Sequence, residues 1–307
     1  MTEPATSVLL DQALVERISN LRVRARRAVD GVRSGIHRSP HRGASMIFAE
    51  HRDYRPGDDL RTLDWRAYAR NDRYTVKRFE QETHLRASLL LDVSASMAYD
   101  GGKPETRKSQ YAASLLAALG FILLGQGDAV GAYVFDSDLR ATLPARSRPD
   151  QLDALLTALS TAPRATRSTT TPQLARALGS VGDRVGRRGM LVLASDLLDP
   201  DPAALRPLSQ LAALGHEVLV LHTLHPDELD FPFRNSLRFE DAEGPDMLET
   251  DAAAVRSAYH EEMTRFVDDC RQRCISAGAR YALARTDRPE EEVLASLLLP
   301  GRRSGWV

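Results

Sequence analysis

The strongest constraint on the fold is the stretch 89–96, an apolar run that ends in Asp-x-Ser-x-Ser. Because a strand that is buried on both faces is apolar throughout, this run predicts a central strand of a mostly parallel sheet. Ligands of such sheets bind just beyond the carboxyl ends of the strands, where Asp92 stands. The carboxylate of Asp92 and the hydroxyls of Ser94 and Ser96 can converge on a hard cation, although Asp and Ser are also common turn formers and helix N-caps.

Two further stretches carry oxygen-bearing side chains at comparable places. A second apolar run, residues 191–195, ends in Asp196, and threonines occupy 169–171 directly before a helical pattern. Among the oxygen-bearing side chains of these three stretches, we take Asp92 and Asp196 as the carboxylate ligands. Few charged ligands with retained water suit Mg²⁺ or Mn²⁺ better than a Ca²⁺ cage, and His or Cys would be expected around zinc. If these oxygens hold a metal, the ion expected is therefore Mg²⁺ or Mn²⁺.

Together these stretches resemble the metal-ion-dependent adhesion site (MIDAS) of the von Willebrand factor A domain. In that site the ligands come from Asp-x-Ser-x-Ser, a later Thr and a later Asp. The resemblance selects Thr169 from the run of threonines, while Thr170 and Thr171 stay open. The metal ligands that it implies are Asp92, Ser94, Ser96, Thr169 and Asp196.

A longer resemblance rests on the motif Arg-x-Tyr-x-Pro-Gly-Asp-Asp-x-Arg-x-x-Asp-Trp at residues 52–65. Val-Lys-Arg-Phe-Glu-Gln-Glu follows at 76–82, and Asp-x-Ser-x-Ser-Met at 92–97. This combination is similar to the domain of unknown function 58 (DUF58) family, which carries a von Willebrand A-like core. We interpret residues 51–70 as a structural ion-pair network around Trp65 rather than as a catalytic site.

Apolar runs alternate with helical patterns along most of the chain, which predicts an α/β fold with a mostly parallel sheet flanked by helices. We expect strand 89–93 at its centre, a long amphipathic helix over residues 8–33, and a hairpin from 236 to 250. Asp136 and Asp138 follow a strand and precede a reversal, so we interpret them as a hairpin turn and not as metal ligands. The other expected strands are 127–135, 139–143, 190–194, 217–224 and 280–285, and the other expected helices are 106–124, 152–159, 174–181, 202–214, 252–277 and 290–299.

This pattern and the two resemblances together imply three segments. Residues 1–85 form a family-specific N-terminal segment, with the long helix, the Pro-Gly-Asp-Asp stretch and a leading strand. Residues 86–225 form the von Willebrand A-like core. Residues 226–307 form a C-terminal extension packed on that core.

Bulk properties narrow the classes of function. The formal net charge of −1 gives no reason to expect nucleic-acid binding by the whole protein. Cys270 and Cys274 lack the partners of a zinc site and are expected to be reduced core residues, which fits the cytoplasm. We find no secretory signal, and the apolar window 111–124 is too short to cross a bilayer of ~30 Å, so no transmembrane segment is expected.

Enzymatic alternatives lack their usual motifs. A metal-dependent hydrolase or phosphoryl-transfer enzyme could use the same Asp and Ser residues, but Gly101-Gly102-Lys103 is no phosphate-binding loop, and neither serine lies in a Gly-x-Ser-x-Gly elbow. His222 and His225 are expected to be structural. We therefore expect a non-enzymatic, metal-dependent protein-interaction module with no catalytic residues. The DUF58 resemblance further implies a MoxR-type AAA+ ATPase as partner, in chaperone-like assembly or maturation of other proteins.

Overall fold

The computed structural model describes most of the chain in two compact units, Met1–Ile36 with Leu85–Val307, and His37–His84. In the smaller unit, strands β1 (His51–Asp53) and β2 (Thr75–Lys77) pair antiparallel. The expected turn and helix around Trp65 lie outside the described residues, as does the rest of the leading strand. The structure describes residues 12–37, 51–53, 75–77, 85–161, 174–186, 188–199, 201, 203–242 and 246–298.

The larger unit is built on a six-stranded sheet with the order β10-β7-β6-β3-β4-β5. All neighbours are parallel except β4 and β5, which form an antiparallel pair at one edge. Strand β3 lies between β6 and β4, and its leucines are at most 1% exposed, as the continuous apolar run predicted. The predicted fold class is confirmed. The strands are β3 (Arg86–Asp92), β4 (Ala129–Phe135), β5 (Leu139–Arg146), β6 (Met190–Ser195), β7 (Glu217–Leu224) and β10 (Arg280–Arg285).

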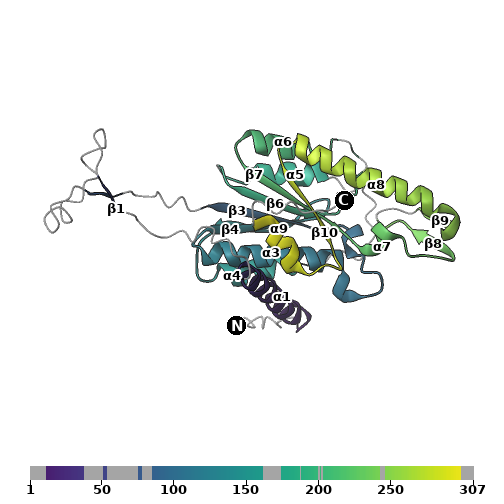
Figure 1. Cartoon of the computed structure of the whole chain (residues 1–307), viewed down its shortest axis with the longest axis horizontal. Helices are drawn as coiled ribbons and strands as arrows, with labels where there is room; N and C mark the ends of the chain where they lie inside the picture. Colours follow the sequence, from purple (N-terminus) through teal and green to yellow (C-terminus); the bar gives the residue numbers. More distant parts are fainter. Residues whose placement is uncertain are drawn as a thin grey trace, which may run out of the picture. The chain divides into compact units, whose positions relative to one another are not determined.

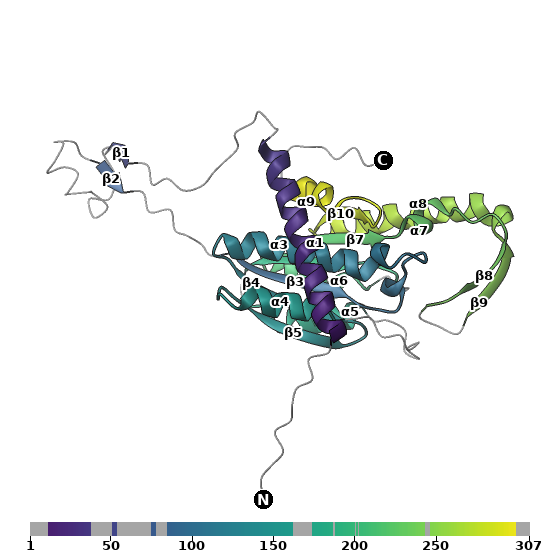
Figure 2. The same cartoon turned by 90° about the horizontal axis from the view of Figure 1, so that it is seen from below.

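Helices cover both faces of this sheet (Figure 1). One face carries α5 (Leu174–Gly182), α6 (Arg206–Ala213) and α8 (Ala252–Ser276), whose apolar side chains form one core cluster with the sheet. The opposite face carries the helices of the second core cluster, with α1 packed outside α3 and α4 (Figure 2). They are α1 (Gln12–His37), α3 (Lys108–Gly125), α4 (Gln151–Leu159) and α9 (Glu290–Leu298).

Helix α1 has one apolar and one basic face, as its sequence pattern predicted. Leu21, Ala25, Ala28 and Val29 are buried against the core. On its polar side, Arg22 pairs with Asp153 of α4. The helix therefore packs on the core of the larger unit through apolar contacts, while Arg22, Arg26 and Arg27 are exposed.

Helix α3 is the most apolar helix of the core. It has the length and hydropathy of a membrane span, with a mean hydropathy of 1.2 over 18 residues, and is longer than the apolar window expected from sequence. However, 72% of this stretch is buried inside the fold. The burial is that of a core helix, and among the described residues no other helix has this length and hydropathy.

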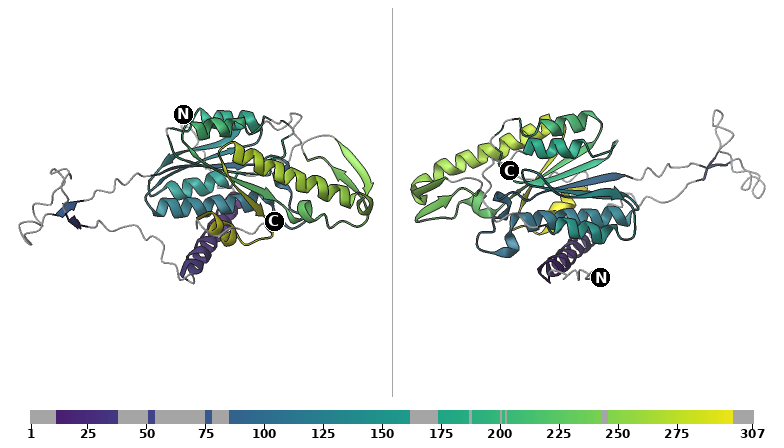
Figure 3. Two further views of the ribbon diagram at one scale, coloured as in Figure 1. Left: turned by 45° about the horizontal axis from the view of Figure 1, so that its top comes forward. Right: turned by 180° about the vertical axis from the view of Figure 1, so that it is seen from behind.

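The C-terminal part of the chain contributes to the same sheet. After β7 come a short helix α7 (Pro226–Asp230) and an antiparallel hairpin of β8 (Ser236–Glu240) and β9 (Met247–Asp251), which lies beside the first turns of α8 (Figure 3). Strand β10 then returns to the edge of the sheet next to β7. The expected boundaries at 85 and 225 stay predictions; α1 and β10, from the two flanking segments, pack in the same unit as the core strands.

The antiparallel pair at the sheet edge contains a position that tolerates only glycine. At the irregularity in the β4–β5 pairing, a Cβ on Gly131 would lie 2.5 Å from the carbonyl oxygen of Leu143 and 2.6 Å from the nitrogen of Ala145. Because both are backbone atoms, we expect Gly131→Ala to destabilise the protein by about 1–3 kcal/mol. Gly125→Ala is the control, since a Cβ added there would have no atom within 4 Å other than those of the adjoining residues and of its own helix backbone. Equal thermal midpoints of the two variants would contradict this assignment.

Candidate metal centre

The loop after β3 gathers the first three predicted ligands. Asp92 is the last residue of β3, and its Oδ1 accepts a hydrogen bond of 2.9 Å from the backbone nitrogen of Ser94. A short 3-10 helix, Ser96–Ala98, then turns the chain so that the Ser94 and Ser96 hydroxyl oxygens lie 3.1 Å apart. All three side chains are at most 9% exposed. The loop therefore presents one carboxylate and two hydroxyls as a compact buried group.

Strand β6 brings Asp196 to the same group because β6 and β3 are parallel neighbours. Asp196 is 2% exposed and accepts a hydrogen bond from the Ser96 side chain, which helps to lower its pKa. Ser195 also joins the two loops, since its hydroxyl donates a 2.6 Å hydrogen bond to Oδ2 of Asp92. Asp92, Ser94, Ser96 and Asp196 are thus together, while Thr169 and its alternatives Thr170 and Thr171 lie outside the described residues.

A lysine that the sequence analysis missed contacts this group. Lys108 opens helix α3, is fully buried, and places its Nζ 2.8 Å from Oδ2 of Asp196. The same Nζ lies 2.6 Å from Oε1 of Glu228 in α7. Burial alone would lower the pKa of Lys108, but the two carboxylates raise it above its ordinary value, so the side chain is charged at neutral pH. The signal in the sequence was a lone charge at the start of an otherwise apolar helix.

The two aspartates differ in charge because only one of them has a cation. Burial would raise the pKa of Asp196, but the ammonium of Lys108 holds it below its ordinary value. Burial and the negative charge of Asp196 together raise the pKa of Asp92 to about 7, although the hydrogen bonds from Ser195 and Ser94 act to lower it. The site is therefore short of positive charge as soon as Asp92 ionises.

Both histidines near the site have hydrogen-bond partners within the fold. Nε2 of His222 lies 2.9 Å from the backbone oxygen of Asp196 and Nδ1 lies 2.7 Å from the hydroxyl of Tyr281, while burial lowers the pKa of His222 to about 4. Nδ1 of His225 accepts a hydrogen bond from the nitrogen of Asp227 and caps α7. These rings hold the backbone of the site in place, which agrees with the structural role expected for them.

Asp136 and Asp138 form the turn expected between β4 and β5. Oδ1 of Asp136 accepts a hydrogen bond of 3.0 Å from the nitrogen of Asp138, and its Oδ2 pairs with Arg140 at 2.6 Å. Among the described residues, no three His, Cys, Asp or Glu side chains form a metal-binding cluster. The predicted site does not need such a cluster, because half of its described ligands are hydroxyls.

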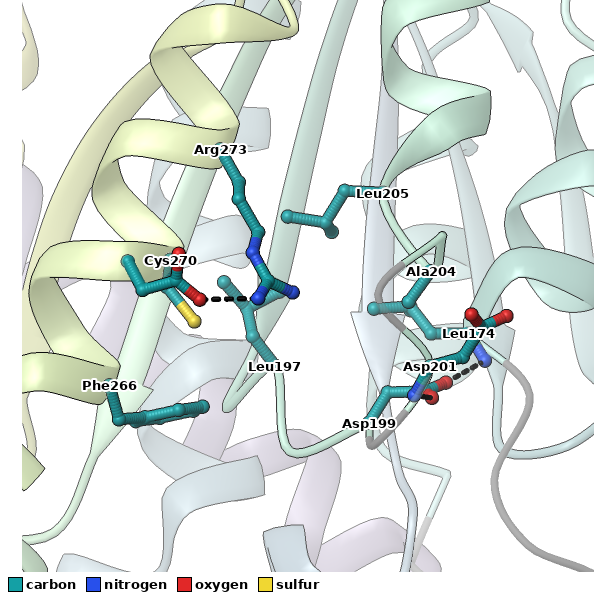
Figure 4. A pocket seen from close by; sticks show the side chains of 10 residues that line it. Leu174, Leu197, Asp199, Asp201, Ala204, Leu205, Phe266, Cys270 and Arg273 are labelled. Carbon is teal, nitrogen blue, oxygen red and sulfur yellow. Dashed lines mark hydrogen bonds and ion pairs between the residues drawn. The ribbon is translucent and has the colours of Figure 1, made fainter. Parts of the chain in front are cut away.

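A small pocket lies beside the loop that follows Asp196 (Figure 4). It measures about 150 Å³, and Leu197, Leu205 and Phe266 form much of its apolar wall. Cys270 also lines it, and burial raises the pKa of this thiol to about 11. Cys270 and Cys274 are free and buried, as expected of core residues. A thiol with so high a pKa is a weak nucleophile at neutral pH, so Cys270 does not give this pocket a reactive thiolate.

The family model described as "Protein of unknown function DUF58" matches residues 50–267, which is more than half of the chain. The chain belongs to this family. Uncharacterized proteins of Mycobacterium bovis and Mycobacterium tuberculosis are each 30% identical to this DUF58 protein over 286 residues, covering 91% of this chain and 86% of theirs.

Several solved structures are similar to this DUF58 protein at low identity. BatB from Bacteroides thetaiotaomicron is 16% identical with a TM-score of 0.40, over 69% of this chain and 96% of BatB. An aerotolerance-related membrane protein from Bacteroides fragilis is 21% identical with a TM-score of 0.42, over the same shares. Proximal thread matrix protein 1 of the mussel byssus, with a zinc-occupied MIDAS motif, is 17% identical with a TM-score of 0.35, over 46% of this chain and 38% of that one. At these scores the likenesses carry no conclusion about ligands.

The side chains of this DUF58 protein themselves fit a hard divalent ion. The donors are carboxylate and hydroxyl oxygens, which are the ligands that Mg²⁺ and Mn²⁺ prefer. Among the described residues no cationic side chain contacts Asp92, whose oxygens accept hydrogen bonds from Ser94 and Ser195, so a bound ion would supply the counter-charge of this carboxylate. Lys108 is the one feature that opposes an ion, because its positive charge already contacts Asp196.

Proposed function

We propose that this DUF58 protein is a non-enzymatic interaction module that binds another protein through a divalent metal ion. The observation that carries the proposal is the buried group of Asp92, Ser94, Ser96 and Asp196 at the carboxyl edge of the sheet. This edge is where open α/β sheets bind their ligands. Mg²⁺ or Mn²⁺ would be held by these four residues and by Thr169, which the MIDAS resemblance adds.

The bound ion would supply an electrophilic centre for a negatively charged oxygen. With few anionic ligands, the ion keeps part of its positive charge, so a Glu or Asp side chain of a partner gains much by completing its coordination. An ordinary ion pair between exposed side chains contributes only about 0–1 kcal/mol. Metal and carboxylate together therefore form the specific contact of the proposed interface.

A catalytic function has less support from the described residues. The hydroxyls of Ser94 and Ser96 hydrogen-bond to each other, and the side chain of Ser96 also hydrogen-bonds to Asp196. His222 contacts the backbone oxygen of Asp196 and neither of these serines. Among the described residues, these serines therefore have no histidine that could act as their base. Turnover of ATP or a phosphoester that disappears in Asp92→Ala would favour the hydrolase alternative. We propose that the protein does not bind nucleic acid. We also propose that it is located in the cytoplasm, where its buried thiols stay reduced.

The family resemblance supports a MoxR-type AAA+ ATPase, or its client, as the protein that supplies the carboxylate. The main alternative is docking on the basic face of α1, where Arg26 and Arg27 are exposed. The two modes differ in their response to solution conditions. Metal-bridged binding requires the ion, whereas binding to the arginines is screened by salt and indifferent to a chelator.

We expect a MoxR-type ATPase encoded beside this chain to be captured by it in Mg²⁺ and lost in EDTA. Ser96→Ala should weaken the capture, because it removes one ligand and the hydrogen bond to Asp196. Ser137→Ala, which removes a hydroxyl from the neighbouring β4–β5 turn, is the matched control and should capture normally. A pull-down in EDTA and in raised salt measures both modes, and undiminished capture in EDTA would refute the metal bridge.

A further inference from the structure

Lys108 occupies an unusual place for a lysine, because its whole side chain is buried beside the proposed metal ligands. Its Nζ is fixed between Oδ2 of Asp196 and Oε1 of Glu228 at 2.8 and 2.6 Å. The other oxygen of Glu228 accepts a 2.7 Å hydrogen bond from the backbone nitrogen of His225. The ammonium is thus held from both sides and cannot turn toward solvent without leaving two carboxylates unpaired.

The balance of charge around this lysine bears directly on metal binding. The charge of Asp196 acts on Asp92, and Asp196 shares Lys108 with Glu228. Among the described residues, Lys108 is the one cation that contacts any of these three carboxylates. A divalent ion held by Asp196 would share that carboxylate with the ammonium. Two positive charges that contact the same buried carboxylate repel each other strongly. The positive charge of Lys108 therefore lowers the affinity of the site for the ion.

We infer that Lys108 is an internal counter-ion that competes with the divalent metal for Asp196 and thereby sets the metal affinity of the site. The inference rests on the proposed metal-binding function and adds a residue that controls it. While no ion is bound, Lys108 pairs with both Asp196 and Glu228 and offsets one of their two negative charges. When an ion binds, the ammonium weakens it, so a further carboxylate from a partner has a correspondingly larger effect on retention of the ion.

The test is Lys108→Met, which keeps the length and apolar stem of the side chain and removes its charge. Calorimetric titration with Mn²⁺ is expected to show at least tenfold tighter binding than in the wild-type protein, because the repulsion is gone. Mn²⁺ should also raise the thermal midpoint of Lys108→Met more than that of the wild type, since it replaces the lost counter-charge. Arg140→Gln is the control. It removes a cation that pairs with Asp136 at the same edge of the sheet, and it should leave the Mn²⁺ affinity unchanged.

Each result bears on a different part of the inference. If the wild type binds Mn²⁺ and Lys108→Met binds it equally or more weakly, Lys108 is a structural clamp and the inference is wrong. If neither binds Mn²⁺, the proposed metal function fails and the inference fails with it. If Lys108→Met binds Mn²⁺ more tightly and adding Asp92→Ala abolishes the binding, the proposed metal function and the role of Lys108 are both supported. The ion would then bind at this site.

A second variant covers the case in which Lys108→Met does not fold. Lys108→Met combined with Glu228→Gln removes the ammonium together with one of the carboxylates that it neutralises, so only Asp196 loses its partner. This double variant is expected to fold and to bind Mn²⁺ more tightly than the wild type. If both variants stay unfolded even in millimolar Mn²⁺, the ion does not replace the lost charge, and the inference is contradicted.

Discussion

Asp196→Asn is expected to lower the free energy of unfolding of the metal-free protein by about 3–5 kcal/mol. The substitution breaks a buried ion pair and leaves the ammonium of Lys108 without one of its two carboxylate partners. Asp196 is 2% exposed and Lys108 is fully buried, so water cannot solvate the ammonium when the carboxylate is lost. Glu228 remains as a partner but is more exposed than Asp196. The residue should therefore be essential for stability as well as for the ion.

Denaturant unfolding in EDTA at pH 7.5 measures this effect. Asp153→Asn is the control, since Asp153 forms an exposed pair with Arg22 and its loss should cost at most about 1 kcal/mol. If Asp196→Asn were no more destabilising than Asp153→Asn, the buried pair would contribute little, and the electrostatic description of the site would be wrong.

Asp92→Asn is expected to act in the opposite direction. The pKa of Asp92 is raised to about 7 in the folded protein, against 3.8 as its ordinary value, so between these values the folded state binds more protons than the unfolded state. The stability that Asp92 contributes through its preference for the protonated form in the fold is fully present below about pH 4. It is lost as the pH rises through about 7, where Asp92 ionises in the folded protein. An amide is never ionised, so we expect Asp92→Asn to stabilise the metal-free protein by ~1–3 kcal/mol at pH 7.5.

The pH dependence separates this cause from a general effect of the substitution. The gain in stability of Asp92→Asn over the wild type should shrink to about zero at pH 4, where Asp92 is protonated in the folded wild type. Saturating Mg²⁺ should remove the gain, because the ion stabilises only the wild type. A variant that is destabilised equally at both pH values would show that the hydrogen bonds from Ser94 and Ser195 matter more than the buried charge.

Sequence patterns predicted the parts of the site that depend on strands. Leu89–Leu91 identify a strand buried on both faces, and Asp92 ends it, so the side chain comes to the carboxyl edge in any parallel sheet. The apolar run before Asp196 places a second carboxylate at the same edge. The structure brings these two together because β3 and β6 are neighbours, which the resemblance to the von Willebrand A core implied and periodicity alone does not show.

The counter-ion could not be predicted in the same way. Lys108 lies 88 residues from Asp196 and 120 from Glu228 along the chain. Their contact depends on how α3 crosses the sheet and on where α7 begins after β7, and no local pattern specifies either. Ser195 was missed for a different reason. It sits at the buried end of β6, where a serine is easily taken as a neutral part of the apolar run.

Titration of the wild-type protein and Asp92→Ala with Mg²⁺ and Mn²⁺, by calorimetry and by the thermal midpoint, tests the central claim most directly. We expect the wild type to bind one ion at millimolar concentrations or below and to unfold at a higher temperature when the ion is bound, since a ligand of the folded state stabilises it by mass action. Asp92→Ala should show neither effect. Absence of both binding heat and midpoint shift in the wild type would contradict the metal site.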